Sequence, residues 1–509
     1  MNGREKSDPA IVAVKPANGA GRPAEERGEP RAGAEGNAGE PHTRRELDRE
    51  SVSPGLDRVR QAARQRKEAK FISLLTHVTD GLDAAYQALR RDAAPGVDGL
   101  TWADYGTDLG PRLADLESRV HRGGAYRALP ARRVMIPKED GRQRPLAIAA
   151  LEDKIVQRAT LKVLNAIYEE DFLGFSYGFR PGRSQHDALD ALVVGIERRK
   201  VNFILDADIR SFFDEVSHAW LVRFLEHRIG DKRIIRLIGK WLKAGVLEDG
   251  IVSAGERGTG QGAVISPLLA NVYLHYAFDL WAEQWRRREA SGDMIIVRYA
   301  DDLVLGFEHE ADAWAFWEAM RERLGTFELQ LNADKTRLIE FGRHAAANRE
   351  RRGLGKPQTF DFLGFTFISG KSRRGSFLVK RKSRRSRVKA RLQAIKVELR
   401  RRMHHAIPEQ GRWLSQVVTG FFAYHAVPTN TGTLVAFRHQ VTVLWRRTLR
   451  RRSQNDDTSW RRIGKIADHW LPRPHVLHPW PYQRFAAKHP RWEPYAGKPH
   501  VRFCAGGAP

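Results

Sequence analysis

The sequence predicts an α+β fold, because amphipathic helices and short apolar strands occur within one stretch of the chain. Residues 71–89 and 152–172 carry apolar side chains at helical spacing, which predicts a helix in each. Residues 202–209 form an apolar run that predicts a strand, and residues 294–307 contain two apolar runs on either side of a polar centre, which predicts a β-hairpin. We expect this globular region to end near residue 370.

The composition excludes several classes of protein and favours a nucleic-acid partner. The chain has 509 residues, of which 41% are hydrophobic, enough for two or three domains with sizeable cores. No apolar run approaches the roughly 18–20 residues of a membrane helix, and the N-terminus lacks a signal peptide's apolar core, so we expect a cytoplasmic protein outside the membrane. A single cysteine, Cys504, excludes an intramolecular disulfide and a zinc site made of cysteines. The formal net charge of +26 predicts a polyanionic partner, the alternative being a well-solvated surface.

Changes in composition divide the chain into four parts. Residues 1–65 are rich in Gly, Pro, Ala, Glu and Arg, which predicts a disordered N-terminal tail. Residues 66–370 form the globular part. Residues 371–450 begin with a strongly basic stretch, in which apolar residues at helical spacing predict a basic amphipathic helix. Residues 451–509 mix aromatic residues with Arg, His and Pro, which is typical of a nucleic-acid-binding segment and also of ordinary packed loops.

Acidic residues accompany the apolar strands at two places. Asp301 and Asp302 lie in the polar centre of the hairpin, and Asp208 lies near the end of the strand at residues 202–209. Adjacent carboxylates at a tight turn are costly unless a cation lies beside them, and a divalent metal is a suitable one. Phosphoryl transfer by two metal ions about 3.5–4 Å apart requires carboxylates from separate strands. The three residues therefore favour a two-metal site over the alternative, an ordinary surface turn.

Eight motifs in order along the chain resemble the sequence blocks of reverse transcriptases encoded by bacterial group II introns. They are GVDG at residues 96–99, IPKEDGRQRPLAI at 136–148, SYGFRPGRSQHDAL at 176–189, DADIRSFFDEVSH at 206–218, GQGAVISPLLANVYL at 260–274, YADD at 299–302, LQLNADKT at 329–336 and FDFLGFTF at 360–367. The fourth motif departs from the family, which most often has Lys and Gly after Ile, but Arg210 keeps the charge and Ser211 is small. No departure affects a carboxylate.

The resemblance implies a right-hand polymerase fold of the α+β class. Residues 66–370 would form helical fingers and a palm of antiparallel strands, and residues 371–450 an α-helical thumb, also called the maturase domain. Residues 413–441 resemble the signature of that domain. Residues 451–509 would be a short basic DNA-binding segment. Many relatives add a C-terminal HNH endonuclease with paired CxxC elements, and we expect it to be absent because Cys504 is the single cysteine.

The resemblance also assigns the metal site. Asp208, Asp301 and Asp302 would be the catalytic residues and the ligands of two Mg²⁺ ions, and the backbone carbonyl of Ile209 would be an additional ligand. Phe213 would be an aromatic gate beneath the sugar, where its ring would clash with a ribonucleotide 2′-hydroxyl. Without the surrounding motif, an ordinary core phenylalanine is the alternative.

Further residues are implied to bind the incoming nucleotide and the template. Lys138 and Arg144 would bind the triphosphate, for which an ammonium and a guanidinium are suited. Two solvated surface charges are the alternative. The remaining assignments are Gln261 and Gly262 to the nucleotide and template, Lys335 to the neighbourhood of the triphosphate, and Arg180 and Arg183 to the template strand. Gly262 would permit close backbone approach, the alternative being a plain turn glycine.

The function implied by the resemblance is RNA-directed DNA polymerisation for a group II intron. The enzyme would copy intron RNA into DNA during retrohoming and would assist intron splicing as a maturase. Its partners would be the intron RNA, a DNA target and primer, and deoxynucleoside triphosphates, and a homodimer is compatible with the family. Two alternatives stay open: a domesticated host reverse transcriptase acting in DNA repair or phage defence, and a splicing-only RNA-binding maturase. An RNA-templated RNA polymerase conflicts with Phe213.

Overall fold

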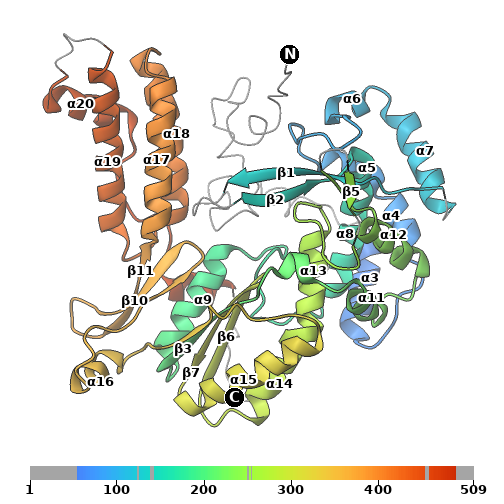
Figure 1. The fold of residues 1–509 in the computed structure, drawn as a ribbon, viewed down its shortest axis with the longest axis horizontal. Helices are drawn as coiled ribbons and strands as arrows, with labels where there is room; N and C mark the ends of the chain where they lie inside the picture. The colour runs from blue at the N-terminus through green and yellow to red at the C-terminus, as the bar shows by residue number, and fades with distance from the viewer. Residues whose placement is uncertain are drawn as a thin grey trace, which may run out of the picture.

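The computed structural model of the chain describes residues 54–122, 125–137, 143–248, 251–253, 255–452 and 458–488. Helices and largely antiparallel sheets occur together, so the predicted α+β class is confirmed. Figure 1 shows a central sheet with a helical lobe on one side and a bundle of long helices on the other. None of the described helices has the length and apolar character needed to cross a membrane.

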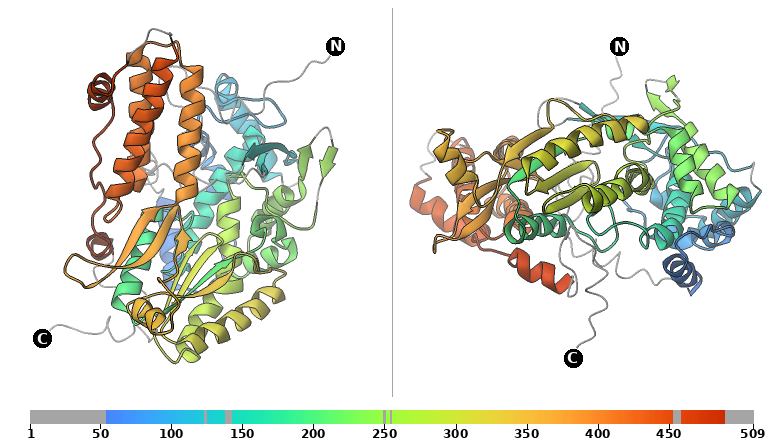
Figure 2. Two further views of the ribbon diagram at one scale, coloured as in Figure 1. Left: turned by 60° about the vertical axis from the view of Figure 1, so that its left-hand side comes forward. Right: turned by 90° about the horizontal axis from the view of Figure 1, so that it is seen from below.

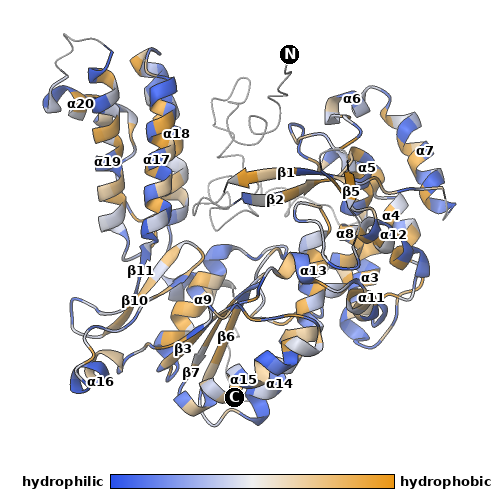
Figure 3. Cartoon of the chain, in the orientation of Figure 1, coloured by the Kyte–Doolittle hydropathy of each residue, from blue (hydrophilic) through white to orange (hydrophobic). Residues whose placement is uncertain are grey.

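The central sheet has four antiparallel strands in the order β6-β7-β3-β8. The strands are β6 (Met294–Tyr299), β7 (Asp302–Phe307), β3 (Phe203–Asp208) and β8 (Arg337–Glu340). The predicted hairpin is β6 and β7, whose branched and apolar side chains suit a pleated, buried surface (Figure 3). Helix α9 (Gln185–Arg198) packs against β6, and α15 (Glu310–Thr326) packs against β3 and β7. The sheet is therefore anchored by helices while its strand ends stay free to form a site.

The lobe beside the sheet is mainly helical and carries a second sheet, with strands in the order β2-β1-β4-β5. Its central helix is α8 (Leu151–Tyr168), buried on most sides, which confirms the helix predicted there. The helix predicted over residues 71–89 is divided in two near Gly81. In Figure 1, β1 and β2 project toward the helical bundle. The other elements of the lobe are α4 (Leu75–Thr79), α5 (Leu82–Gln87), α6 (Trp102–Gly106), α7 (Leu109–His121), β1 (Ala131–Pro137), β2 (Gln143–Ile148), α11 (His218–Glu226), α12 (Lys232–Lys243), β4 (Val246–Glu248), β5 (Ile251–Ser253) and α13 (Ser266–Leu274). The π-helix η1 (His275–Asp279) and α14 (Leu280–Arg288) continue from α13 to the central sheet, where they lie beside α15 (Figure 1).

Residues 54–65 differ from the predicted disorder. They form helix α3 (Pro54–Gln65), in which Leu56, Val59 and Ala63 are buried and face α8. Their spacing of three and four residues is that of an amphipathic helix. The predicted end of the tail, residue 65, lay too far along the chain. Three apolar residues among many polar ones give only a weak hydrophobic pattern. Residues 1–53, the rest of the predicted tail, lie outside the described residues.

The bundle stands on a third sheet and has its own hydrophobic core. The sheet has the order β11-β10-β9, with β9 (Phe360–Phe362), β10 (Phe365–Lys371) and β11 (Phe377–Ser383). The bundle helices are α17 (Arg385–Arg401), α18 (Ile407–His425), α19 (Thr431–Arg450) and α20 (Trp460–Trp470). The apolar residues of the bundle form one cluster, and those of the lobe and central sheet form another. The boundary predicted at residue 370 thus falls inside β10, and the bundle itself begins at α17.

After α20 the chain returns to the central sheet, as Figure 2 shows. Helix α21 (Pro481–Lys488) packs on α9. There Tyr482 donates a hydrogen bond to Glu197, and Arg484 Nε lies 3.4 Å from Asp190 Oδ2. The described part of the predicted DNA-binding segment is thus divided between the bundle and the surface of α9. Its DNA-binding role stays a prediction, and residues 489–509 lie outside the described residues.

Candidate active site

The predicted metal ligands meet at one end of the central sheet. Asp208 ends β3 and is the register partner of Asp302, which begins β7. Asp301 lies in the turn between β6 and β7, next to Ala300, whose φ of 55° is a left-handed conformation that is uncommon for a residue with a Cβ atom. The fold therefore brings together carboxylates from two strands that are far apart in the sequence. Ile209, the predicted carbonyl ligand, directly follows β3.

A cavity of about 840 Å³ lies over these carboxylates. The sequence-predicted residues that line it are Asp208, Ile209, Phe213, Gln261, Asp301, Asp302 and Lys335. Asp302 is exposed to the cavity, but partial desolvation by the cavity walls, together with repulsion from Asp301 and Asp208, raises its pKa above the usual value of an aspartate. A nearby cation would reverse this shift, because opposite charge favours the ionised carboxyl.

The donor set fits Mg²⁺, which prefers carboxylate and carbonyl oxygens. As the side chains lie, however, the described residues contain no group of three or more His, Cys, Asp or Glu side chains that could hold a metal ion. Lys335 Nζ lies 2.8 Å from Asp208 Oδ2, and Asn332 Nδ2 lies 3.1 Å from the same oxygen. Convergence of the carboxylates on an ion therefore requires small rotations, including release of Asp208 from Lys335.

Phe213 lies on α10 (Phe212–Glu215), the short helix that follows β3. Its half-buried ring packs edge-on against Phe212, with ring centroids 5.5 Å apart. Its backbone carbonyl accepts a hydrogen bond of 2.8 Å from the N–H of Thr259, which ties α10 to the loop that carries Gln261. The ring is thus held at the wall of the cavity, at the place predicted for a sugar gate. Its role as a gate stays a prediction.

Gly262 marks a close approach between two parts of the chain. Its φ is 110°, and a Cβ atom there would lie 2.8 Å from the carbonyl oxygen of Ala147 on β2. The neighbouring carbonyl of Gln261 accepts a hydrogen bond of 2.5 Å from the N–H of Ala147. Only glycine combines this conformation with so short a distance. The loop is therefore fixed against β2 by its backbone.

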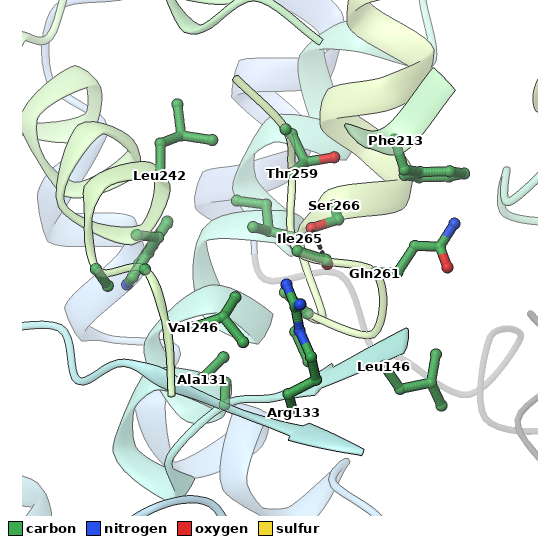
Figure 4. Close-up of a pocket in the computed structure, with 18 of the residues that line it drawn as sticks. Ala131, Arg133, Leu146, Phe213, Leu242, Val246, Thr259, Gln261, Ile265 and Ser266 are labelled. Carbon is green, nitrogen blue, oxygen red and sulfur yellow. Dashed lines mark hydrogen bonds between the residues drawn. The ribbon is translucent and has the colours of Figure 1, made fainter. Parts of the chain in front are cut away.

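A second cavity, of about 560 Å³, lies between this loop, β1 and β2 (Figure 4). Phe213 and Gln261 line both cavities, so the two adjoin. Arg133 extends from β1 into the second cavity, where its guanidinium binds Glu248 at 2.8 Å. The hydroxyl of Thr259 in its wall is buried and has no hydrogen-bond partner among the described residues. The loop around Gln261 thus separates two spaces of nucleotide size.

The four remaining predicted residues lie away from the cavity or outside the described part of the chain. Arg180 is 5% exposed, and its guanidinium donates to Glu169 and to two carbonyls of its own loop. These bonds tie the loop to the C-terminal end of α8, and the predicted contact of Arg180 with the template stays a prediction. Arg183 is half-buried and donates to a loop carbonyl at 2.6 Å, and its template contact stays a prediction. Lys138 lies outside the described residues, as does the side chain of Arg144 on β2.

Residues near the site that the sequence reasoning missed are also charged. Asp206 lines the cavity, and its Oδ2 lies 3.4 Å from Arg337 Nε. Two-residue spacing places Asp206 on the same face of β3 as Asp208, so the DADI motif contained this signal. Arg298 is fully buried beneath the turn. Its signal was a charged residue inside an otherwise apolar strand.

Comparison with known proteins identifies the family. Residues 136–367 match the family described as reverse transcriptase (RNA-dependent DNA polymerase). The chain is 36% identical over 318 residues to the protein YkfC of Escherichia coli (strain K12). The aligned region covers 56% of this chain and 78% of YkfC. It is 39% identical over 155 residues to the group II intron-encoded protein LtrA of Lactococcus lactis subsp. cremoris. The chain belongs to the reverse transcriptase family.

Other relatives of this reverse transcriptase include the nuclear intron maturase 3, mitochondrial, of Arabidopsis thaliana, which is 32% identical over 130 residues. The similarity spans 26% of LtrA and 18% of the Arabidopsis protein. The family match from residue 136 to 367 contains β3, β6 and β7, and therefore the three carboxylates.

Proposed function

We propose that this chain is the RNA-directed DNA polymerase of a group II intron, which copies intron RNA into DNA during retrohoming and assists the intron to splice. The single observation that carries the proposal is the position of Asp208 opposite Asp302 across β3 and β7, with Asp301 in the adjoining turn. In this proposal the central sheet is the palm, the lobe with β1 and β2 is the fingers, and α17–α20 are the thumb. The family match supports this arrangement.

The proposed chemistry is phosphoryl transfer at the three carboxylates. Two Mg²⁺ ions, when bound there, would activate the primer 3′-hydroxyl and stabilise the leaving pyrophosphate. The strands set the backbone positions of Asp208 and Asp302, and the turn sets that of Asp301, so side-chain rotation alone would bring the three carboxylates onto the ions. Lys335, which lies at Asp208, is free to turn toward the triphosphate once its carboxylate partner binds an ion.

The nucleotide and the template are assigned to the two adjoining cavities. The incoming deoxynucleotide occupies the cavity over the carboxylates, with its sugar against Phe213. The templating base lies on the other side of the Gln261 loop, toward β2. The buried hydroxyl of Thr259 supplies a polar group to that space. Gln261, which lines both cavities, contacts the nascent base pair.

The helical bundle is the proposed surface for intron RNA. Residues 371–410 contain 15 Lys or Arg and two acidic residues. Arg384 and Arg387, where the bundle begins, line the cavity, so the basic charge is continuous with the active site. Phosphate neutralisation by such a surface favours RNA binding and makes it sensitive to salt.

The polymerase proposal is tested by primer extension. Purified protein should add deoxynucleotides to a DNA primer on an RNA template when Mg²⁺ is present, and Asp301→Asn should abolish the product because a metal ligand is lost. Asp115→Asn, an exposed carboxyl on α7, is the matched control and should retain activity. If the parent protein binds RNA but extends no primer, the polymerase proposal is wrong and a splicing cofactor is the better assignment.

A further inference from the structure

Beneath the Asp301 turn, on the other face of the central sheet, lies a buried ion pair between Arg298 and Asp279. Tyr299 is the register partner of Asp302 and so shares its face, and Arg298, one residue earlier on β6, points to the opposite face. The side chains of Arg298 and Asp279 are both 0% exposed. An ion pair so deeply buried is weak support for stability, since its desolvation offsets its attraction. Its presence calls for another explanation.

The Arg298 guanidinium has a partner for each of its five N–H groups. Nε donates to Asp279 Oδ1 at 2.7 Å, and Nη2 donates to Asp279 Oδ2 at 2.5 Å and to Ser176 Oγ at 2.7 Å. Nη1 donates at 3.0 Å to Asn271 Oδ1 and at 3.0 Å to the backbone carbonyl of Ala300. The bond to the Ala300 carbonyl reaches the turn itself. The network therefore connects α13 and η1, which carry Asn271 and Asp279, to the residue before Asp301.

The turn is held from a second side by backbone packing. A Cβ atom at Gly178 would lie 2.2 Å from the N atom of Ala300, so the two backbones are in close contact. The carbonyl of Gly178 accepts a hydrogen bond of 2.7 Å from Asn271 Nδ2. Asn271 thus binds both Arg298 and the segment that packs on Ala300. These contacts hold Ala300 in its left-handed conformation, which an alanine disfavours.

The position of Asp279 depends on an irregular helix. Asp279 ends the π-helix η1 (His275–Asp279), between α13 and α14. A π-helical turn is rare and is frequently found at functional sites. It lets α13 and η1 present Asn271 and Asp279 to the same guanidinium. The irregularity therefore has a specific use at this point of the fold.

We propose that the Arg298–Asp279 pair positions the metal-binding turn: it fixes the Ala300 carbonyl, so that Asp301 and Asp302 are directed toward Asp208. This inference rests on the proposed function for the identity of the metal site. Arg298 does not contact the substrate or the metal. It acts through the backbone of the turn and is a positioning residue.

The test is the replacement Arg298→Lys, which keeps the charge but cannot form the five-bond fork. We expect Mn²⁺ binding to the protein without nucleic acid, measured by electron paramagnetic resonance of free Mn²⁺, to weaken 10–100-fold, or roughly the effect of losing an outer-shell partner. In primer extension, kcat should fall by a similar factor, the KM for nucleotide should change little, and the Mg²⁺ requirement should rise.

A matched control separates positioning from stability. Arg228 is also buried, pairs with Asp171 and donates to four backbone carbonyls in the lobe, far from the turn in the sequence. Arg228→Lys should lower the melting temperature at least as much as Arg298→Lys while leaving Mn²⁺ affinity unchanged. If Arg298→Lys does not fold, the double variant Arg298→Met/Asp279→Leu is tested in its place. It removes both buried charges together and leaves neither one unpaired.

The outcomes are distinct. Parental Mn²⁺ affinity and parental kcat in a folded Arg298 variant would overturn the positioning role. Weaker Mn²⁺ binding in the variant supports the positioning role even if the parent protein extends no primer. In that case the polymerase proposal fails by itself, and the two proposals are tested separately. Asp301→Asn, measured in the same titration, establishes which Mn²⁺ signal belongs to this site.

Discussion

Among single residues, Phe213 has the most direct link between position and substrate choice. Its half-buried ring packs edge-on against Phe212, and its backbone carbonyl accepts a hydrogen bond from Thr259. It lines the cavity over Asp208. A ring at this place would exclude an additional hydroxyl by steric contact, whereas a smaller side chain would leave room for it.

We therefore expect Phe213→Val to accept ribonucleotides. The ratio of kcat/KM for a deoxynucleotide to kcat/KM for the matching ribonucleotide should fall by about 10–200-fold, the range over which pocket fit discriminates small groups. Single-nucleotide incorporation kinetics measure this ratio. Phe316→Leu, at a buried ring on α15 that does not line the cavity, is the control and should lower stability without changing the ratio. An unchanged ratio in Phe213→Val would exclude the gate.

Among the secondary-structure elements, the junction of α9, α18 and the segment before α21 is unusual because three histidines meet there, and within the described part of the chain no acidic side chain pairs with their rings. His186 on α9 stacks on His478, with ring centroids 3.9 Å apart, and His425 at the end of α18 is bound to Ser383. Burial lowers the pKa of His478 to about 4 and that of His425 to about 3. Nearby cations contribute to both shifts: Arg484 and Arg381 at His478, and Arg387 and Arg391 at His425. These rings are neutral in the folded protein.

The junction should therefore lose stability as the pH falls. An unfolded histidine takes up a proton near pH 6.5, whereas the folded rings do so near pH 4 or below, so the unfolded state binds more protons between these values. Stability is fully present above about pH 6.5 and declines toward pH 4, by roughly 1.4 kcal/mol per pH unit for each histidine.

Thermal unfolding measured from pH 7.5 to pH 5 tests this expectation. His478→Gln keeps a polar side chain that can donate to the Ala423 carbonyl but cannot titrate, and it should reduce the slope of melting temperature against pH. His404→Gln, on the exposed surface, is the control and should leave the slope unchanged. A parental slope in His478→Gln would show that this ring does not set the acid sensitivity.

In the whole molecule, the two separate hydrophobic clusters divide the chain into a catalytic part and a bundle. Trp445 is a fully buried side chain of the bundle cluster, and its Nε1 donates a hydrogen bond of 2.8 Å to Gln410. The bundle is joined to the rest where Tyr424 donates to the Leu363 carbonyl and Asn430 accepts from the Ser383 N–H, and the chain then returns to α9 through α21. Two cores joined in this way need not unfold together.

We expect Trp445→Ala to destabilise the bundle selectively, by about 3–5 kcal/mol, because a large cavity is left in its core. Hydrogen exchange should increase in α17–α20 and stay slow in β3, β6 and β7. Trp285→Ala, in the other cluster, should give the opposite pattern. Uniform exchange changes in both variants would show that the two clusters unfold as one unit.

The sequence by itself determined the α+β class, the β6–β7 hairpin and the three carboxylates, because each depends on spacing within a short segment. A strand followed by Asp, and a polar turn between apolar strands, carry their meaning locally. The weak apolar pattern of α3 marks the limit of that signal.

Tertiary structure alone decided the roles of the arginines. A guanidinium suits a phosphate and a buried carboxylate equally well. Arg180 pairs with Glu169 and Arg298 with Asp279 because packing removed them from solvent, and packing is set by segments distant in the chain.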